Sequence, residues 1–468
     1  MFNYKVKVGL VPMRRNTTDR PRGASWNWYS PEQRCKKIVE YIEGNFTNNN
    51  VEFVDTKGLG IGDLIFDYKT AAQAIERMKS ENVDAVVIIN CNFGNEEAAG
   101  EIARALGKPV LLWAPLDEEY SPDGTRTTDS QCGLFGVSRQ LQRFHIPFSN
   151  IPSCKVEDEE FKEGFERFVR VACMVKNFKG MRIGQVGTRP APFYSVICNE
   201  GELLEKFGIQ IVTINFAIVE QRMKSAAENN KEEIEVFANY FRTNFKMDDL
   251  TPQYVEKMAT MAVMYKNLFE EFELDIMAAE CWTATPIMFE GLAPCAVFGL
   301  LNDLGYMISC ESDIHCAMTM AVLKAATLGE GVPIFGEFTV RHPENKNAEL
   351  LWHCGQFPLS QKAETSEARL VNQREWFRGK DGTYTAARID QESGNYMLLP
   401  LICQTTKGPE TNGTYIWAEF ENLQKVEDRL MQGPYIHHFI EIEGDYRREL
   451  DEFCKYIPNL SIDRALER

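Results

Sequence analysis

Apolar runs alternate with amphipathic stretches through the first two thirds of the chain. Residues 5–13, 84–90 and 109–113 form nearly continuous apolar runs, which are typical of strands buried in a parallel sheet. Between these runs, residues 70–81 and 96–106 carry apolar side chains at helical spacing. Strands that alternate with helices in this way predict a doubly wound α/β domain.

A second α/β set follows, and the pattern then changes. Strands are predicted at 181–187, 210–214, 275–279 and 306–309, and helices at 200–207, 219–244, 252–272 and 294–304. Beyond residue 335, period-2 segments separated by glycine and asparagine turns predict a small antiparallel sheet or barrel. The expected fold is therefore α/β, with two tandem doubly wound parallel-sheet domains, 1–176 and 177–334, followed by an antiparallel β domain, 335–468.

Length and composition narrow the classes of function. A chain of 468 residues is too long for a single core, and its formal net charge of −17 argues against nucleic acid as a partner. No apolar run reaches the roughly 18 residues of a membrane span, and the first residues lack the apolar segment of a signal peptide. We therefore expect a cytoplasmic protein without membrane contact. Its 13 cysteines contain no CxxC pair and are expected to be reduced thiols.

Carboxylates and imidazoles gather between residues 310 and 355. Glu311 lies in an acidic turn before a helix, Glu337 is expected at the end of an apolar strand, and His353 ends another. His437 and His438 follow far downstream. Such groups at the ends of buried strands lie beside clefts in α/β enzymes. Carboxylate oxygens with imidazoles suit Mn²⁺, Mg²⁺ or Co²⁺.

Each of these residues also has a purely structural interpretation. A glutamate after a strand is often a helix cap or an ion-pair partner, and a histidine between apolar strands is often a core residue. Asp313 is expected to cap the following helix or to support a ligand from behind, and His315 to pack or to contact substrate. Other catalytic motifs are absent, because the chain has no HExxH, GxSxG or Walker A sequence. The glycines between residues 58 and 62 lack the full GxGxxG pattern of a nucleotide loop.

Several short motifs together resemble the L-fucose/L-arabinose isomerase superfamily. The resemblance is densest over residues 275–360 and fits that family's order of domains. The motifs are Cys281-Trp282, Pro294-Cys295, Leu301-Asn302-Asp303, Cys310-Glu311-Ser312-Asp313-Ile314, Ala317-Met318-Thr319-Met320 and His353-Cys354-Gly355.

The resemblance implies a metal-dependent aldose–ketose isomerase, with Mn²⁺ preferred and active sites between the subunits of a homohexamer. Proton transfer would run through a cis-enediol. By the same resemblance, Glu311 and Glu337 are the metal-binding and catalytic carboxylates, and His353 and His438 are further ligands. His437 would lie near the substrate, although the choice between His437 and His438 as the ligand is open.

An arginine-rich segment after the first strand bears on the substrate. Arg14, Arg15, Arg20 and Arg22 are followed by Trp26 and Trp28. The arginines either pair with the acidic surface or clamp an anionic group on the sugar, because a guanidinium suits a sulfonate, phosphate or carboxylate. Trp26 could pack on the sugar, and Trp282 is a further substrate-binding candidate.

Three alternatives for the function are left open. The first is an isomerase of a 6-sulfo hexose, converting sulfoquinovose to sulfofructose, instead of a neutral sugar. The second is a sugar-binding protein without catalysis, and the third is another metal-dependent sugar enzyme.

Overall fold

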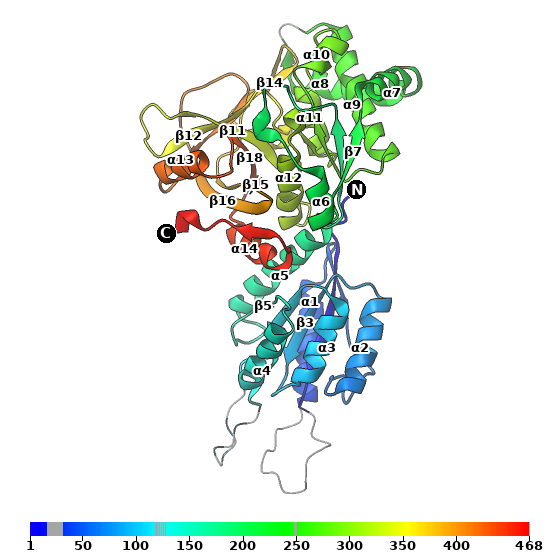
Figure 1. Cartoon of the computed structure of the whole chain (residues 1–468), viewed down its shortest axis with the longest axis vertical. Helices are drawn as coiled ribbons and strands as arrows, with labels where there is room; N and C mark the ends of the chain where they lie inside the picture. The colour runs from blue at the N-terminus through cyan, green and yellow to red at the C-terminus, as the bar shows by residue number, and fades with distance from the viewer. Residues whose placement is uncertain are drawn as a thin grey trace. The chain divides into compact units, whose positions relative to one another are not determined.

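The computed structural model describes residues 1–15, 31–117, 120, 122, 124, 126, 128–247 and 250–467. Its contacts divide the chain into two compact units, one formed by Tyr4–Lys176 and the other by Met1–Asn3 with Asn177–Arg468. Figure 1 shows both units. The second α/β region and the β-rich region share the larger unit, so the domain boundary expected after residue 334 stays a prediction.

The smaller unit is built on a parallel sheet with strand order β2-β1-β3-β4-β5. Apolar side chains of α2, α3 and α4 cover one face of it, while Phe161 of α5 packs on Trp113 at the other. The strands are β1 (Val6–Met13), β2 (Val51–Val54), β3 (Ala85–Asn90), β4 (Val110–Trp113) and β5 (Ser149–Asn150). The helices are α1 (Glu32–Phe46), α2 (Tyr68–Ser80), α3 (Glu96–Leu106), α4 (Ser130–Arg143) and α5 (Glu159–Phe178).

Two of the cysteines are neighbours in the fold. Cys35 of α1 and Cys91, directly after β3, have a Cα–Cα distance of 6.0 Å. The two residues are 56 positions apart, so their proximity depends on the packing of α1 on the sheet and no local spacing reveals it. The other 11 cysteines are free thiols.

The larger unit begins with a parallel sheet in the order β10-β9-β6-β7. The helix expected over residues 219–244 is in fact two helices, because Asn230 leaves the helical conformation at φ −115° and ψ 35°. The strands are β6 (Arg182–Val186), β7 (Gln210–Ile214), β9 (Ile276–Ala279) and β10 (Ile308–Ser309). The helices are α6 (Glu200–Phe207), α7 (Phe216–Asn229), α8 (Lys231–Asn244), α9 (Pro252–Glu271), α10 (Ala284–Met288), α11 (Cys295–Asp303) and α12 (Ile314–Ala326).

Six antiparallel strands then close into a barrel, because β16 pairs with both β15 and β17. These strands are β11 (Ile334–Arg341), β12 (Ala348–His353), β15 (Thr383–Glu392), β16 (Asn395–Thr406), β17 (Thr414–Glu419) and β18 (His438–Glu443). The fold class predicted from the sequence is thereby confirmed. Four short strands extend the sheet and two helices flank it: β8 (Lys246–Met247), β13 (Arg369–Val371), β14 (Arg374–Arg378), β19 (Leu460–Ile462), α13 (Leu423–Gln432) and α14 (Arg447–Tyr456).

Helix α12 connects the parallel sheet to the barrel. Every residue of α12 is buried, and the helix contacts β6, β9 and β10 as well as β15 and β18. A helix that is apolar on all sides is stable only inside a core. The turn before α12 and the strands of the barrel are thus fixed relative to one another. Within the described residues, we find no helix that is long and apolar enough to cross a membrane.

Candidate metal centre and active site

The turn before α12 holds Glu311 in an unusual backbone conformation. Glu311 and the next residue, Ser312, have φ values of 59° and 55°, a left-handed region that costs residues other than glycine about 1–3 kcal/mol. Asp313 then caps α12, accepting the backbone N–H of Cys316 at 3.0 Å. The buried helix fixes this turn, and Glu311 is left only 8% exposed.

Neighbouring strands bring Glu337 and His438 together. The two residues are direct partners in the antiparallel pair β11–β18, and such partners place their side chains on the same face. The sequence placed Glu337 at the end of a strand, which is wrong, because β11 continues to Arg341. The strand runs on through Thr339 and Val340, whose side chains are exposed, so the apolar run that marked it stops before the strand does.

Four of the predicted residues converge. The Nε2 atom of His438 lies 3.2 Å from Oε2 of Glu311 and 4.0 Å from Oε1 of Glu337. The Nε2 atom of His353, the last residue of β12, lies 3.5 Å from the same Glu337 oxygen. His437 is also near, because it can offer a ligand atom within 4.8 Å of those of Glu337 and His438.

Three buried atoms at this point make no hydrogen bond within the described part of the chain: Glu311 Oε2, His353 Nε2 and His438 Nε2. Leaving a buried polar atom unpaired costs about 1–3 kcal/mol, so three such atoms facing one another indicate a ligand. Two carboxylates and two imidazoles match the donors that Mn²⁺, Mg²⁺ or Co²⁺ accept. The residues therefore fit a divalent cation.

Burial and mutual contact separate the pKa values of the two glutamates. Burial raises the pKa of Glu337 to about 7, with the charge of His438 opposing and that of Glu311 adding to it. Burial alone would raise the pKa of Glu311, but the contact with His438 and the charge of His438 outweigh burial and lower this pKa. Burial lowers the pKa of His437 to about 4, helped by the charge of His438.

Behind His438 lies a buried ionic network. Asp313 Oδ2 accepts from Nδ1 of His438 at 3.0 Å and from Arg388 at 2.9 Å, and both Asp313 and Arg388 are fully buried. A carboxylate on the far nitrogen of a metal-binding histidine orients the ring and fixes its tautomer. Asp313 is therefore both a helix cap and a support for His438, which the sequence offered as alternatives. Its pKa is held well below the usual value, because Arg388 and His438 outweigh the opposing effect of burial.

Sequence reasoning missed Arg388 and Asp390. Arg388 donates to Asp390 Oδ2 at 2.7 Å, and Asp390 in turn lies 3.3 Å from Nδ1 of His315. His315 is thus a buried residue behind the centre. Two opposite charges two residues apart, on either side of the apolar Ile389, were the available signal, because period-2 spacing places both on one face.

The predicted substrate residues are spread over both units. Arg14 pairs with Glu32, and the guanidinium of Arg15 lies 4.6 Å from the centre of the Phe93 ring. Both arginines belong to the smaller unit, whereas Arg20, Arg22 and Trp26 lie outside the described residues. In the larger unit, the ring of His437 lies edge-on to that of His438, with ring centres 4.4 Å apart.

Trp282 is linked to the centre by ring contacts through Phe193, a residue that the sequence analysis did not identify. Its ring centre lies 5.5 Å from that of Phe193, which is in turn 6.2 Å from the ring centre of His438. Trp282 is 42% exposed and is therefore available to a ligand beside the centre.

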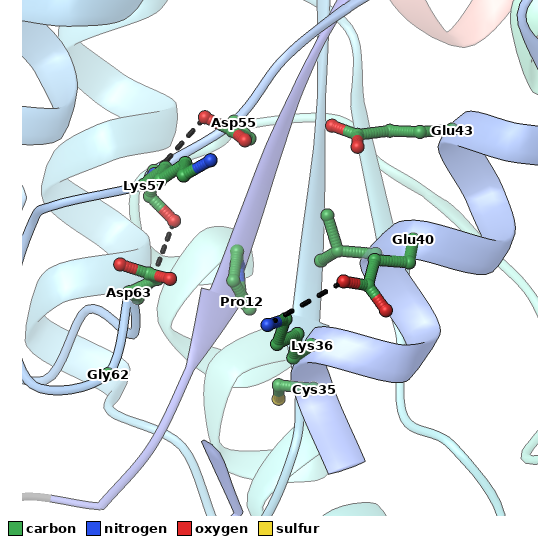
Figure 2. A pocket seen from close by; sticks show the side chains of 11 residues that line it. Pro12, Cys35, Lys36, Glu40, Glu43, Asp55, Lys57, Gly62 and Asp63 are labelled. Carbon is green, nitrogen blue, oxygen red and sulfur yellow. Dashed lines mark hydrogen bonds and ion pairs between the residues drawn. The ribbon is translucent and has the colours of Figure 1, made fainter. Parts of the chain in front are cut away.

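The glycine-rich loop of the smaller unit lies beside a cavity of about 240 Å³ (Figure 2). The N–H of Gly58 already donates to Asp63 Oδ1 at 2.7 Å, so that amide is not free for a phosphate. Carboxylates outnumber cations around the cavity, which disfavours a phosphate ligand. The charged lining residues are Lys36, Lys57, Glu40, Glu43, Asp55 and Asp63.

Comparison with known proteins points in one direction. Residues 26–179 match the family model of the fucose/sulfoquinovose isomerase N-terminal domain. The sulfoquinovose isomerase of Priestia aryabhattai is 26% identical over 397 residues, which are 82% of this chain and 86% of that protein. The sulfoquinovose isomerase of Alkalicoccus urumqiensis is 26% identical over 381 residues, covering 79% and 83%.

The family model and these relatives support the fucose isomerase-like superfamily that the sequence motifs resemble. The resemblance seen in the sequence was densest over residues 275–360, whereas the family model matches the N-terminal unit, so separate parts of the chain support the same superfamily. Among solved structures, a solute-binding protein from Bacillus halodurans with bound myo-inositol covers 69% of this chain and 89% of its own at 13% identity. Its TM-score is 0.17, too low to bear on the superfamily assignment.

Proposed function

We propose that this protein is a metal-dependent aldose–ketose isomerase whose substrate is a 6-sulfo hexose such as sulfoquinovose. The observation that carries the proposal is the convergence of Glu311, Glu337, His353 and His438, with buried atoms that make no hydrogen bond within the described chain. The sulfoquinovose isomerases that resemble the chain over about four fifths of its length support the choice of substrate.

Glu311, Glu337 and His438 are the proposed metal ligands, with His353 as a fourth ligand or directly behind. The proposed ion is Mn²⁺, with Mg²⁺ or Co²⁺ as alternatives. When bound, it supplies positive charge that offsets the negative charge developing on the substrate oxygens. Asp313 and Arg388 hold His438 in the orientation that this set needs.

The reaction itself needs only proton transfers. One proton moves between C2 and C1 and another between O2 and O1, so no oxidant or second substrate is required. Glu337 and Glu311 come from different elements and approach His438 separately, which allows them to face different parts of the sugar. We assign to Glu337 the proton of C2, returned to C1, and to Glu311 the proton shared by the two oxygens.

The proposal extends to the assembly and the cellular location. The resemblance to L-fucose and L-arabinose isomerases supports a homohexamer with sites between subunits, in which Arg14, Arg15, Arg20, Arg22 and Trp26 serve a neighbour's centre. The cytoplasm is the proposed cellular location.

A sugar panel tests the function. Purified protein with measured Mn²⁺ content is incubated in D₂O with sulfoquinovose, D-glucose, L-fucose and L-arabinose, and NMR follows ketose formation and deuterium uptake. We expect ketose from sulfoquinovose, with deuterium at the carbon that receives the proton. Metal-loaded protein that converts none of these sugars would refute the proposal.

A further inference from the structure

We infer that a cleft at the carboxyl ends of β6 and β7 holds the anionic group of the substrate, and that Arg189 is the cation that binds it. The inference rests on the proposed function, because it assigns one end of the sugar to a place in the same unit as the metal centre. The cleft, called the β6–β7 cleft below, is described by its lining residues. Those that carry the argument are Thr188, Arg189, Glu200, Thr283 and Ser312.

The topology of the sheet places this cleft where α/β proteins bind ligands. In the order β10-β9-β6-β7, the chain leaves β6 toward one side and β9 toward the other. Ligands of open α/β sheets bind outside the carboxyl ends of the strands at such a switch point. The loop after β6 supplies Thr188 and Arg189, the loop after β9 supplies Thr283, and the volume between them is about 970 Å³. A space of this size accepts a hexose.

The β6–β7 cleft adjoins the metal centre. Ser312, which lines it, follows Glu311 directly and accompanies it in the left-handed turn. Phe193, in the same loop as Arg189, lies between Trp282 and His438, with ring centres 5.5 and 6.2 Å away. We therefore place the far end of a sugar whose C1 and C2 lie at the glutamates in this cleft.

Arg189 carries a charge that no carboxylate of the described chain neutralises. Its guanidinium donates to two nearby carbonyls, of Pro190 at 3.2 Å and Ala191 at 3.0 Å. It lies 4.9 Å from the centre of the Tyr194 ring, which steadies it without changing its charge. Glu200 lines the same cleft but forms no ion pair with Arg189. The guanidinium of Arg189 is therefore held in place and keeps N–H donors for a ligand.

The backbone N–H groups near the cleft that could donate to an anion are already occupied. Oε1 of Glu280 accepts the backbone N–H groups of Trp282 at 3.0 Å and Ala284 at 3.1 Å, as well as that of Thr283, and Oε2 accepts that of Thr285 at 2.9 Å. These amides therefore bind the protein's own carboxylate and no substrate oxyanion. Among the described residues that line the cleft, this leaves the guanidinium of Arg189 as the cationic complement to a negative group.

The chemistry of a guanidinium defines the class of ligand and the arms of the test. Two parallel N–H donors match the oxygens of a sulfonate, a phosphate or a carboxylate. Sulfoquinovose, glucose 6-phosphate and glucuronate carry these three groups, and 6-deoxyglucose is the neutral match. The relative preference of the wild type identifies which oxyanion the cleft takes.

The test measures binding separately from turnover. Calorimetry records the affinity of the 1-deoxy analogue of sulfoquinovose, which cannot isomerise, and of its neutral 6-deoxy counterpart. We expect Arg189→Ala to weaken the sulfonated analogue about 10–100-fold, the loss of a charged hydrogen bond, and to leave the neutral one unchanged. In turnover of sulfoquinovose the loss should fall mainly on KM, and Arg189→Lys should restore part of it. Arg242→Ala, which removes one exposed cation from α8, is the matched control and should change neither affinity.

The outcomes separate this inference from the proposed function. Turnover of sulfoquinovose by the wild type, with equal binding of the sulfonated analogue by Arg189→Ala, overturns the inference and leaves the isomerase standing. A wild type that binds the analogue through Arg189 but converts no sugar supports the cleft and rejects the reaction. If Arg189→Ala does not fold, Arg189→Gln decides in the same way, because it keeps donors for the two carbonyls and loses only the charge.

Discussion

Replacing Asp313 by asparagine should weaken metal binding without touching a proposed ligand. In the wild type, Asp313 Oδ2 accepts from His438 at 3.0 Å and from Arg388 at 2.9 Å, while its other oxygen caps α12. Asparagine keeps the shape and one acceptor but removes the charge that both donors face. A charged hydrogen bond contributes about 1.5–3 kcal/mol, and loss of such a support typically weakens metal affinity 10–100-fold.

Mn²⁺ titration against a competing chelator measures this effect. Asp390→Asn is the matched control, because Asp390 also pairs with Arg388, at 2.7 Å, but contacts His315 instead of His438. Both variants should lose stability, since each leaves the buried Arg388 with fewer partners, whereas only Asp313→Asn should lose Mn²⁺ affinity. Equal Mn²⁺ affinity in Asp313→Asn and the wild type would refute the role of the network as a support for His438.

Three further predictions concern catalysis, pH and assembly. Glu337→Gln should lower turnover at least 10²-fold with unchanged circular dichroism; near-normal turnover would reassign the base. Burial and the charge of Glu427 raise the pKa of Glu349 to about 7, although Arg341 opposes the shift. The contribution of Glu349 to the stability of the fold is therefore complete at pH values below the usual glutamate pKa and is lost as the pH rises through 7. Glu349→Gln should therefore raise the unfolding free energy by about 1–2 kcal/mol at pH 8 and by far less at pH 4; equal gains at both pH values would contradict this. Sedimentation should give a hexamer, and a fully active monomer would disprove it.

The α/β elements were predictable because local signals mark their ends. Helix α3 was placed at its observed bounds: Asn95 accepts the N–H of Ala98 at 2.8 Å at its start, and Gly107 ends it with a φ of 59°. Such caps and glycines are short-range features that a sequence displays directly. The same reasoning missed α13 and α14, whose short amphipathic runs lie between strands of the barrel.

The residues of the candidate site show the same difference between what the sequence displays directly and what only the fold brings together. Glu311, Glu337, His353 and His438 were found because their residue types suit one ion and their motifs resemble a family. Arg388 was missed, because a fully buried arginine is rare and its partner Asp313 is 75 positions away. Arg189 carried no motif, and its importance depends on the absence of an acidic partner in the described chain, which only the fold reveals.

The distribution of charge around the centre bears on the choice of substrate. Glu311 and Glu337 face the proposed ion, whose two positive charges balance theirs. Behind them, Asp313 and Asp390 share the single guanidinium of Arg388, so this cation is committed to the buried network. A sulfonated sugar brings a negative charge that is costly in a site of low dielectric unless a cation faces it. An isomerase of anionic sugars therefore needs a cation that is committed neither to the ion's ligands nor to the buried network, and Arg189, in the cleft beside Ser312, meets that requirement.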